Sequence, residues 1–296
     1  MPDYRQRFTF ENTPIRGELC QLSSVYQRVL KQHDYPPLLK YWLGEMLAAV
    51  SLLGSTIKFD GSLIIQVQSE GPLRLLVGES DPKGGMRAYA RWDEDATRQF
   101  DHADPDLRAV CPGGLVIITI DPGPDMERYQ GIVQLESTLA RSIEDYFERS
   151  EQLATRLWLS ADPEQGEAAG LLLQRLPNAV GDYDDWVRVG MLADTLSDEE
   201  LLREDSKTIL HRLFHEDDLR LFTPQPVYFA CHCSRERVEG MLRSLGEAEL
   251  QDILREKGLI EVLCEYCQAP YQFDQVDVAA LLASEHPGLL GSDQVQ

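Results

Sequence analysis

The sequence predicts an α+β protein in three parts, and three observations support that division. Short apolar runs of the kind expected of strands recur from Thr56 to about Pro177. Acidic clusters alternate with helix-spaced apolar residues through 179–226. Four of the six cysteines fall within 227–296, a segment too short to build a large core. We therefore expect a β-rich N-terminal domain with helices, a helical linker, and a small C-terminal domain that depends on its cysteines.

The strands of the N-terminal domain are predicted from apolar alternation between turn residues. After a turn at 58–61, Leu63, Ile65 and Val67 alternate and share one face of a strand. A similar pattern predicts a strand at 73–77, and a fully apolar run between turn residues predicts a buried strand at 115–120. Three further strands are expected at 129–135, 156–160 and 170–176. These runs make the domain mainly a β structure.

Two helices are expected in the same domain. Ser137 fits the N-cap of a helix that continues through Ile143 and Phe147. A longer helix is expected after Pro36 and Pro37, since prolines favour a helix start. Its inner face would consist of apolar residues at helical spacing: Leu39, Leu43, Met46, Val50 and Leu53.

The linker is expected to be helical and to need a neighbour. Leu202, Ile209, Leu213 and Phe214 could share one side of a helix, opposite acidic clusters at 198–200 and 216–218. An isolated helix of this kind is marginal in water, so its apolar side must be covered. We expect Leu202, Ile209 and Leu213 to be buried against the N-terminal domain, with Pro224 and Pro226 ending the segment.

The C-terminal domain is expected to contain two helices and a hairpin. The helices are predicted at 235–245 and at 247–257, where Gly258 supplies the C-terminal cap. A strand at 259–263 and a second at 271–273 would form the hairpin. The tail at 291–296 is expected to be disordered.

The charge balance excludes several classes of partner. The net charge is −22, and so negative a surface repels phosphate backbones and anionic membranes. We therefore expect neither nucleic acid nor membrane as a partner. No segment is long and apolar enough to span a bilayer, and the first 20 residues lack the apolar run of a signal peptide. A cytoplasmic location follows, where clustered cysteines indicate metal binding or redox activity.

The cysteines of the last segment have the spacing of a metal site. Cys231 and Cys233 form a CxC pair, Cys264 and Cys267 form a CxxC pair, and 30 residues separate the pairs. Two close pairs can supply the four thiolates of a tetrahedral zinc ion. The spacing leaves open a purely structural zinc ribbon and a switchable site. A thiol–disulfide oxidoreductase is disfavoured because the CxxC opens no thioredoxin-like helix, and a nucleic-acid regulator because the chain is acidic.

The remaining cysteines and histidines carry weaker signals. His232 could compete as a ligand, but four thiolates already complete the coordination sphere. His211 and His215 have i, i+4 spacing without an evident third ligand, which favours two polar residues on a helix. Cys20 and Cys111 stand alone and are expected to be buried small hydrophobes. No phosphate loop, Ser/His/Asp series or HExxH occurs, so we do not expect an enzyme.

Several stretches around and beyond the cysteines are those of a known family. They are 229–238 (FACHCSRERV), 261–267 (EVLCEYC), Tyr271 and 273–274, together with 58–61, 71–73, 129–133 and 146–152. On these stretches the sequence resembles the redox-regulated heat-shock holdases of bacteria, the thirty-three-kilodalton heat-shock chaperone family. The resemblance spans essentially the whole chain.

The resemblance implies a definite function. A reduced, zinc-bound form, with Cys231, Cys233, Cys264 and Cys267 as ligands, would be inactive. Oxidation would convert the four cysteines to two disulfides, release zinc, and unfold the C-terminal redox-switch domain and the linker. The protein would then dimerise and hold unfolding client proteins without ATP, so that aggregation is prevented under oxidative and heat stress.

The chemistry of such a switch can be followed from the residues. The apolar core of a C-terminal domain this small supplies only a few kcal/mol of folding free energy, whereas a structural zinc contributes on the order of 10–16 kcal/mol. Four thiolates around Zn²⁺ leave about −2 of formal charge, which Arg235 and Arg237 could moderate unless they are simply solvated.

Within that family's mechanism we expect the disulfides Cys231–Cys233 and Cys264–Cys267. By the chain-entropy model, loops this short stabilise by only about 1.5–2 kcal/mol. A cross-link such as Cys231–Cys264 would close 34 residues and give about 4 kcal/mol. Neighbour pairing therefore leaves the zinc unreplaced and the domain unfolded.

Overall fold

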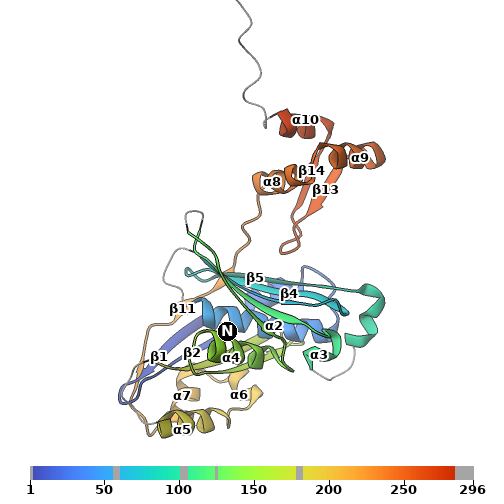
Figure 1. Cartoon of the computed structure of the whole chain (residues 1–296). Helices are drawn as coiled ribbons and strands as arrows, with labels where there is room; N and C mark the ends of the chain where they lie inside the picture. Colours follow the sequence, from blue (N-terminus) through green and yellow to red (C-terminus); the bar gives the residue numbers. More distant parts are fainter. Residues whose placement is uncertain (1–2, 56–60, 101–105, 124–125, 178–182, 284–296) are drawn as a thin grey trace, which may run out of the picture. The chain divides into compact units, whose positions relative to one another are not determined.

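The computed structural model describes residues 3–55, 61–100, 106–123, 126–177 and 183–283. Its contacts divide the chain into two compact units, 1–230 and 231–296 (Figure 1). The segment expected to be a linker lies within the first unit. The turn expected at 58–61 falls almost wholly outside the described residues, as does the tail at 291–296. No helix among the described residues has the length and apolar character needed to cross a membrane.

The first unit contains two six-stranded sheets. In the first sheet the strands run in the order β10 (Leu219–Leu221), β1 (Tyr4–Phe10), β2 (Ile15–Leu22), β9 (Glu167–Arg175) and β8 (Thr155–Asp162), and β11 (Gln225–Pro226) also pairs with β1. In the second the order is β12 (Tyr228–Phe229), β5 (Gly85–Trp92), β4 (Leu73–Ser80), β3 (Ser62–Gln68), β6 (Leu115–Asp121) and β7 (Tyr129–Gln134). All pairings are antiparallel except β12 with β5. The strands predicted from alternation are confirmed as β3, β4, β6, β7, β8 and β9.

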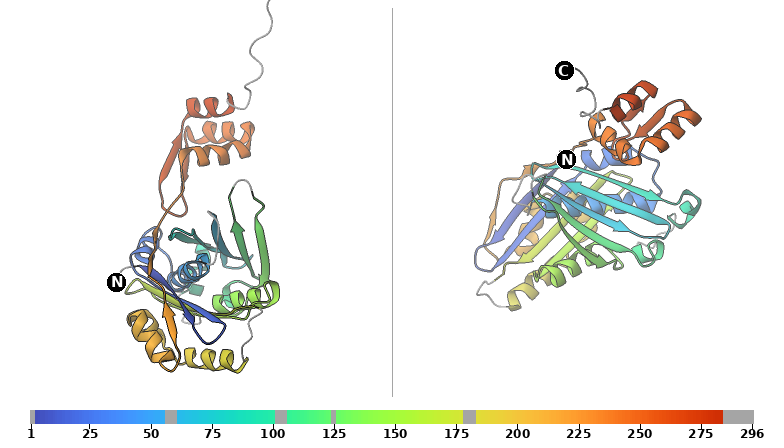
Figure 2. Two further views of the ribbon diagram at one scale, coloured as in Figure 1. Left: turned by 90° about the vertical axis from the view of Figure 1, so that its left-hand side faces the viewer. Right: turned by 45° about the horizontal axis from the view of Figure 1, so that its top comes forward.

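A central helix lies between the two sheets (Figures 1 and 2). It is α2 (Pro37–Gly54), and it packs against β2, β8 and β9 on one side and β3, β4 and β5 on the other. Fifteen of its 18 residues are buried. The prediction of a single inner face was therefore too narrow. The helix is buried nearly all round because a sheet covers each side, and apolar residues outside the predicted face, such as Trp42 and Leu47, are buried as well.

Shorter helices complete this unit. They are α1 (Ser24–Leu30), α3 (Leu107–Val110), α4 (Leu139–Ser150) and a 3₁₀ turn at Glu94–Phe100. The predicted N-cap of α4 was wrong by one residue. Thr138 is in extended conformation and its hydroxyl accepts from the N–H of Arg141, whereas the Ser137 carbonyl accepts from Leu107.

Three helices cover the outer face of the first sheet. They are α5 (Tyr183–Ala193), α6 (Asp198–Arg203) and α7 (Ser206–Phe214). Leu202, Ile209 and Leu213 are buried in a second core with Phe8 and Leu171 of that sheet, which confirms their predicted burial. The prediction that they share one helix was wrong, because Leu202 lies on α6 and the other two on α7. Ser197 and Asp205 cap these helices and so divide the segment.

Polar contacts fix the same helices to the sheet. The Gln21 side-chain amide donates to the carbonyls of Leu201 and Glu204 at 3.0 and 2.7 Å. The Ser206 hydroxyl donates to the Gln6 side chain at 2.6 Å. Each of these hydrogen bonds gives a partner to polar groups that burial removes from water. The helical segment is thus docked on the N-terminal strands, as an outer layer of the first unit.

The second unit is small. It contains α8 (Arg235–Leu245), α9 (Glu247–Lys257), β13 (Ile260–Leu263), β14 (Pro270–Phe273) and α10 (Gln275–Ala283). The two predicted helices and the hairpin are confirmed, and Gly258 caps α9 with a φ of +72°. Helix α10 was not predicted. The core consists of seven buried residues: Leu242, Leu250, Leu254, Ile260, Phe273, Val278 and Leu281.

The central helix carries one carboxyl group in this apolar setting. Glu45 is buried, and its burial raises its pKa to about 8, with Asp198 adding to the rise and a hydrogen bond with Tyr41 opposing it. Between about pH 4.5 and 8 the folded chain then keeps a proton that the unfolded chain has lost. The stability that this group contributes is present below pH 4.5 and is lost as the pH rises through 8.

We expect Glu45→Gln to flatten this pH dependence. The unfolding free energy of the unaltered protein should fall on the order of 1 kcal/mol per pH unit relative to the variant between pH 5.5 and 8. Denaturant unfolding of the reduced proteins measures it, with the exposed Glu148→Gln as control. Parallel pH profiles for all three proteins would contradict the expectation.

Candidate metal centre

The four cysteines of the second unit lie at two neighbouring places in its fold. Cys231 and Cys233 are in the extended stretch before α8, whose N-cap Ser234 accepts from the N–H of Arg237. Cys264 and Cys267 form the turn between β13 and β14. The Gln268 N–H donates to the Cys264 carbonyl at 2.8 Å, and Gln268 itself has a φ of +58°. This tight turn directs both thiols to the same side.

The four sulfur atoms form one cluster. All lie within 4.8 Å of one another, with 3.6 Å between Cys231 and Cys264 and 3.4 Å between Cys233 and Cys267. Four sulfurs at about 2.3 Å from a central zinc ion are separated by roughly 3.8 Å. A disulfide would need about 2.05 Å, and all six cysteines are free. The cluster therefore has the dimensions of an S₄ site for a tetrahedral metal ion.

Protonation of the cluster is strongly uneven. Partial burial opposes ionisation of Cys233, but hydrogen bonds from the Tyr271 hydroxyl and the neighbouring thiols outweigh it and bring the pKa of Cys233 to about 7. Burial and the neighbouring sulfurs raise the pKa of Cys267, and burial also raises that of Cys264. One thiolate thus forms readily, and Cys264 and Cys267 resist ionisation beside it. A cation in the centre would remove that penalty, so the donor set fits a metal ion.

Main-chain donors prepare the CxxC half for negative charge. The N–H groups of Tyr266 and Cys267 donate to the Cys264 sulfur, and the N–H of Ala269 donates to the Cys267 sulfur. In the CxC half, Cys233 directly precedes the N-cap Ser234 of α8 and so lies at the positive end of that helix's dipole. Such groups stabilise thiolates without completing their coordination.

Arg235 has a different role from the one considered from sequence. Its guanidinium donates to the Gln272 carbonyl at 3.0 Å, pairs with Asp277 at 2.8 Å, and lies 4.3 Å from the centre of the Phe273 ring. It therefore holds α8 against β14 and α10, next to the CxC pair. This function was missed because α10 itself was not predicted.

The other candidate residues stay outside the cluster. The described part of the chain holds a single group of potential ligands, and it contains neither His232 nor the pair His211 and His215. Cys20 is fully buried and its pKa is raised to about 12 by burial. Cys111 is 1% exposed and its pKa is raised to about 11 by the same effect. The four clustered cysteines, in contrast, are partly exposed and accessible to an oxidant.

Comparison with known proteins assigns the chain to a family. The sequence profile of the family described as Hsp33 protein matches residues 3–274. A protein of Nitrosococcus oceani named 33 kDa chaperonin is 46% identical over 284 residues, which cover 96% of this chain and 95% of that protein. A protein of the same name from Shewanella frigidimarina is 44% identical, with 96% and 97% covered. The chain belongs to the Hsp33 family.

One solved structure has the same fold. The crystal structure of the 33 kDa chaperonin (heat shock protein 33 homolog) of Thermotoga maritima matches with a TM-score of 0.78 at 20% identity. The match covers 95% of this chain and 98% of that one. The predicted α+β class with its C-terminal cysteine cluster is confirmed.

We expect the reduced protein to bind one zinc ion per chain through four sulfurs. Replacing any one of Cys231, Cys233, Cys264 and Cys267 by Ser should weaken zinc binding at least tenfold, because the shell loses one of its four thiolates. Zinc content and X-ray absorption measure this, and Cys20→Ala and Cys111→Ala are the matched controls. A nitrogen ligand, or zinc loss in either control, would contradict the assignment.

Proposed function

We propose that this protein is a redox-regulated, ATP-independent chaperone of the holdase type. It binds unfolding client proteins in the cytoplasm and limits their aggregation under oxidative and heat stress, and it is not an enzyme. The observation that carries the proposal is the cluster of four partly exposed thiols in the small second unit, which follows the large first unit in the chain. Membership of the Hsp33 family, whose matched relatives are named chaperonins, supports the same conclusion.

Zinc is the proposed ligand of the cluster in the reduced, inactive form. A core of seven buried residues contributes only a few kcal/mol. A structural zinc ion contributes on the order of 10–16 kcal/mol. The folding of residues 231–283 thus depends on the metal.

Oxidation is proposed to form the disulfides Cys231–Cys233 and Cys264–Cys267 and to release the zinc. The resting geometry leaves each thiol within reach of every other, so distance alone does not select the pairing. Pairing within each half is proposed because it restrains only short loops and leaves the two halves unconnected. The unit then lacks both its metal and any cross-link to replace it.

The docked segment at 183–229 is the proposed link to client binding. Its end is continuous with Cys231, the first residue of the second unit. Once that unit unfolds, the segment is joined to a disordered chain, which favours its detachment. Detachment uncovers the apolar face of the first sheet, including Phe8, Phe10 and Leu171. Dimerisation of the oxidised protein is proposed as a further consequence of that exposure.

We expect peroxide at elevated temperature to release zinc and to create activity that suppresses aggregation of a thermally unfolding protein. The reduced zinc-bound form should suppress aggregation at least tenfold less, because its apolar sheet face is covered. Light scattering, with and without ATP, measures the activity, and a metal-sensitive dye measures the zinc. Zinc release without aggregation-suppressing activity would contradict the proposed function.

Proteolytic mapping of the oxidised protein should recover disulfides within each half of the motif. The expected peptides join Cys231 to Cys233 and Cys264 to Cys267. Mass spectrometry of non-reduced digests resolves them. A dominant peptide that joins the two halves would contradict the proposed switch, since it would hold the unit together after zinc loss.

A further inference from the structure

A single segment follows the edges of both sheets in the first unit. Residues 219–229, called the strap here, form β10 and β11 beside β1 and then β12 beside β5 (Figure 1). The register pairs Phe10 with Leu219, Phe8 with Leu221 and Arg5 with Gln225. The strap is therefore a strand added to the edge of β1, and its last part is added to the edge of β5.

The strap is held mainly by its backbone. The Phe222 N–H donates to the Arg7 carbonyl at 3.0 Å, and the Tyr228 N–H donates to the Gly84 carbonyl at 2.9 Å. Residues 220–226 are exposed, and Val227 is the one buried residue of the strap. What the strap covers is therefore chiefly a row of main-chain donors and acceptors, in contrast with the helices α5 to α7, which cover apolar side chains.

Two features make the strap easy to remove and the sheet edges beneath it easy for another strand to occupy. Pro224 and Pro226 have no N–H group, so the strap makes fewer main-chain hydrogen bonds than its length allows. Gly84 has a φ of +94°, and a Cβ there would lie 2.5 Å from the Pro226 carbonyl oxygen. Glycine at this position lets another strand approach the β5 edge closely.

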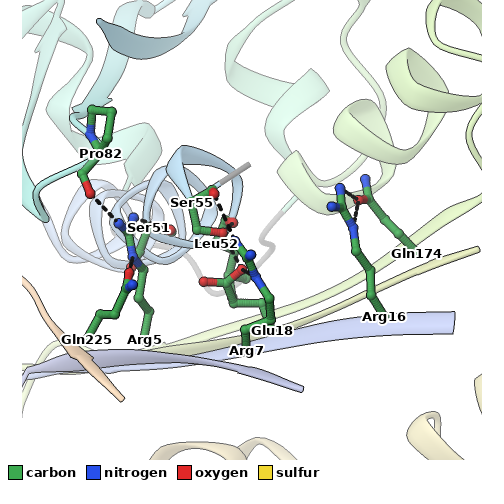
Figure 3. A network of polar contacts seen from close by, with 10 residues as sticks. All are labelled: Arg5, Arg7, Arg16, Glu18, Ser51, Leu52, Ser55, Pro82, Gln174 and Gln225. Atoms are coloured by element: carbon green, nitrogen blue, oxygen red, sulfur yellow. Dashed lines mark hydrogen bonds and ion pairs between the residues drawn. The ribbon is translucent and has the colours of Figure 1, made fainter. Parts of the chain in front are cut away.

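A buried arginine keeps the β1 edge in place beneath the strap. Arg5 is 2% exposed, and its guanidinium donates to the Ser51 carbonyl of α2 at 3.3 Å and to the Pro82 carbonyl at 2.9 Å (Figure 3). Its third contact is the Gln225 side chain in the strap, at 3.3 Å. Two of these three contacts lie in the body of the unit, so β1 stays fixed when the strap leaves.

We propose that the edge of β1, once vacated by the strap, is a strand-addition site for an extended segment of an unfolded client polypeptide. The inference rests on the proposed function and specifies how that client is held. Main-chain hydrogen bonds give affinity without sequence selection, which suits a protein that binds many clients. Phe8 and Phe10 favour client segments with apolar residues at alternate positions, because those side chains extend the same apolar face.

Thr9 offers a substitution that acts on this edge alone. The N–H groups along an antiparallel strand point alternately to its two neighbours. Since the Glu11 N–H donates to the Asp218 carbonyl, and the Arg7 carbonyl accepts from Phe222, the N–H of Thr9 also faces the strap. Thr9→Pro removes this donor and leaves the hydrogen bonds between β1 and β2 intact. Gln134→Pro is the matched control, because Leu135 donates to Gly114 and the N–H of Gln134 therefore faces away from β6.

The full-length proteins would be oxidised and titrated with reduced, carboxymethylated lactalbumin, a permanently unfolded probe, by fluorescence anisotropy. Thr9→Pro should bind the probe about fivefold more weakly, the loss expected for one main-chain hydrogen bond. Gln134→Pro should bind as the unaltered protein does. If Thr9→Pro only loosened the strap, the β1 edge would be vacated more readily and the probe would bind more tightly. Weaker binding of the probe therefore cannot come from a loosened strap.

Hydrogen exchange of the oxidised, unaltered protein provides a second measurement that does not depend on the variant folding. The amides of Arg7 and Thr9, which face the strap, should lose protection on oxidation and regain it when the probe is added. Equal binding by Thr9→Pro, or β1 amides that stay exposed with probe bound, would overturn the strand-addition site while the holdase function stands. Protection of the Arg7 and Thr9 amides in the oxidised protein without probe would also overturn it, because the strap or a second copy of the chain would then occupy the edge. Absence of probe binding by the unaltered protein would instead contradict the proposed function itself.

Discussion

The mutual repulsion of four thiolates within 4.8 Å is the constraint on which the second unit depends. The pKa of Cys233 lies near neutral pH, whereas those of Cys264 and Cys267 are raised, so full ionisation of the cluster requires a cation among the sulfurs. The fold around the cluster supplies main-chain donors to two sulfurs but only a seven-residue core. In the proposed switch, bonds from the metal to sulfur take the place of the apolar burial that a larger domain would use, and chemistry that removes those bonds would remove the fold.

In the proposed switch, such a loss would also affect the first unit. Its central helix is enclosed by two sheets, and from the segment at 183–229 only Val227 is buried in that core, with Phe229 packed against it. The segment forms an outer layer whose helices cover the apolar side chains of the first sheet and whose strap covers the edges of both sheets. The covered surface is thus of two kinds, one apolar and one made of main-chain groups. Both can be exposed while the central core stays folded.

The sequence predicted the parts of this structure that local chemistry determines. Alternation located the strands, and the spacing of Cys231, Cys233, Cys264 and Cys267 located the cluster, because ligand spacing is a local property. The apolar pattern predicted only one buried face for the central helix, because its enclosure by two sheets arises from strand pairings distant in sequence. The strap was missed for the same reason: 219–229 has exposed side chains and two prolines, and only β1 and β5 make it a strand. Arg235 could not be placed without α10, with which it pairs through Asp277.

In the proposed switch the metal, and not the oxidant as such, keeps the segment at 183–229 docked. The decisive measurement is amide exchange after zinc is removed by a chelator under fully reducing conditions. Exchange should rise across 231–283 and then across 183–229, while the amides of α2 stay protected. A zinc-free, reduced protein in which α5 to α7 and the strap exchange as slowly as before would contradict it.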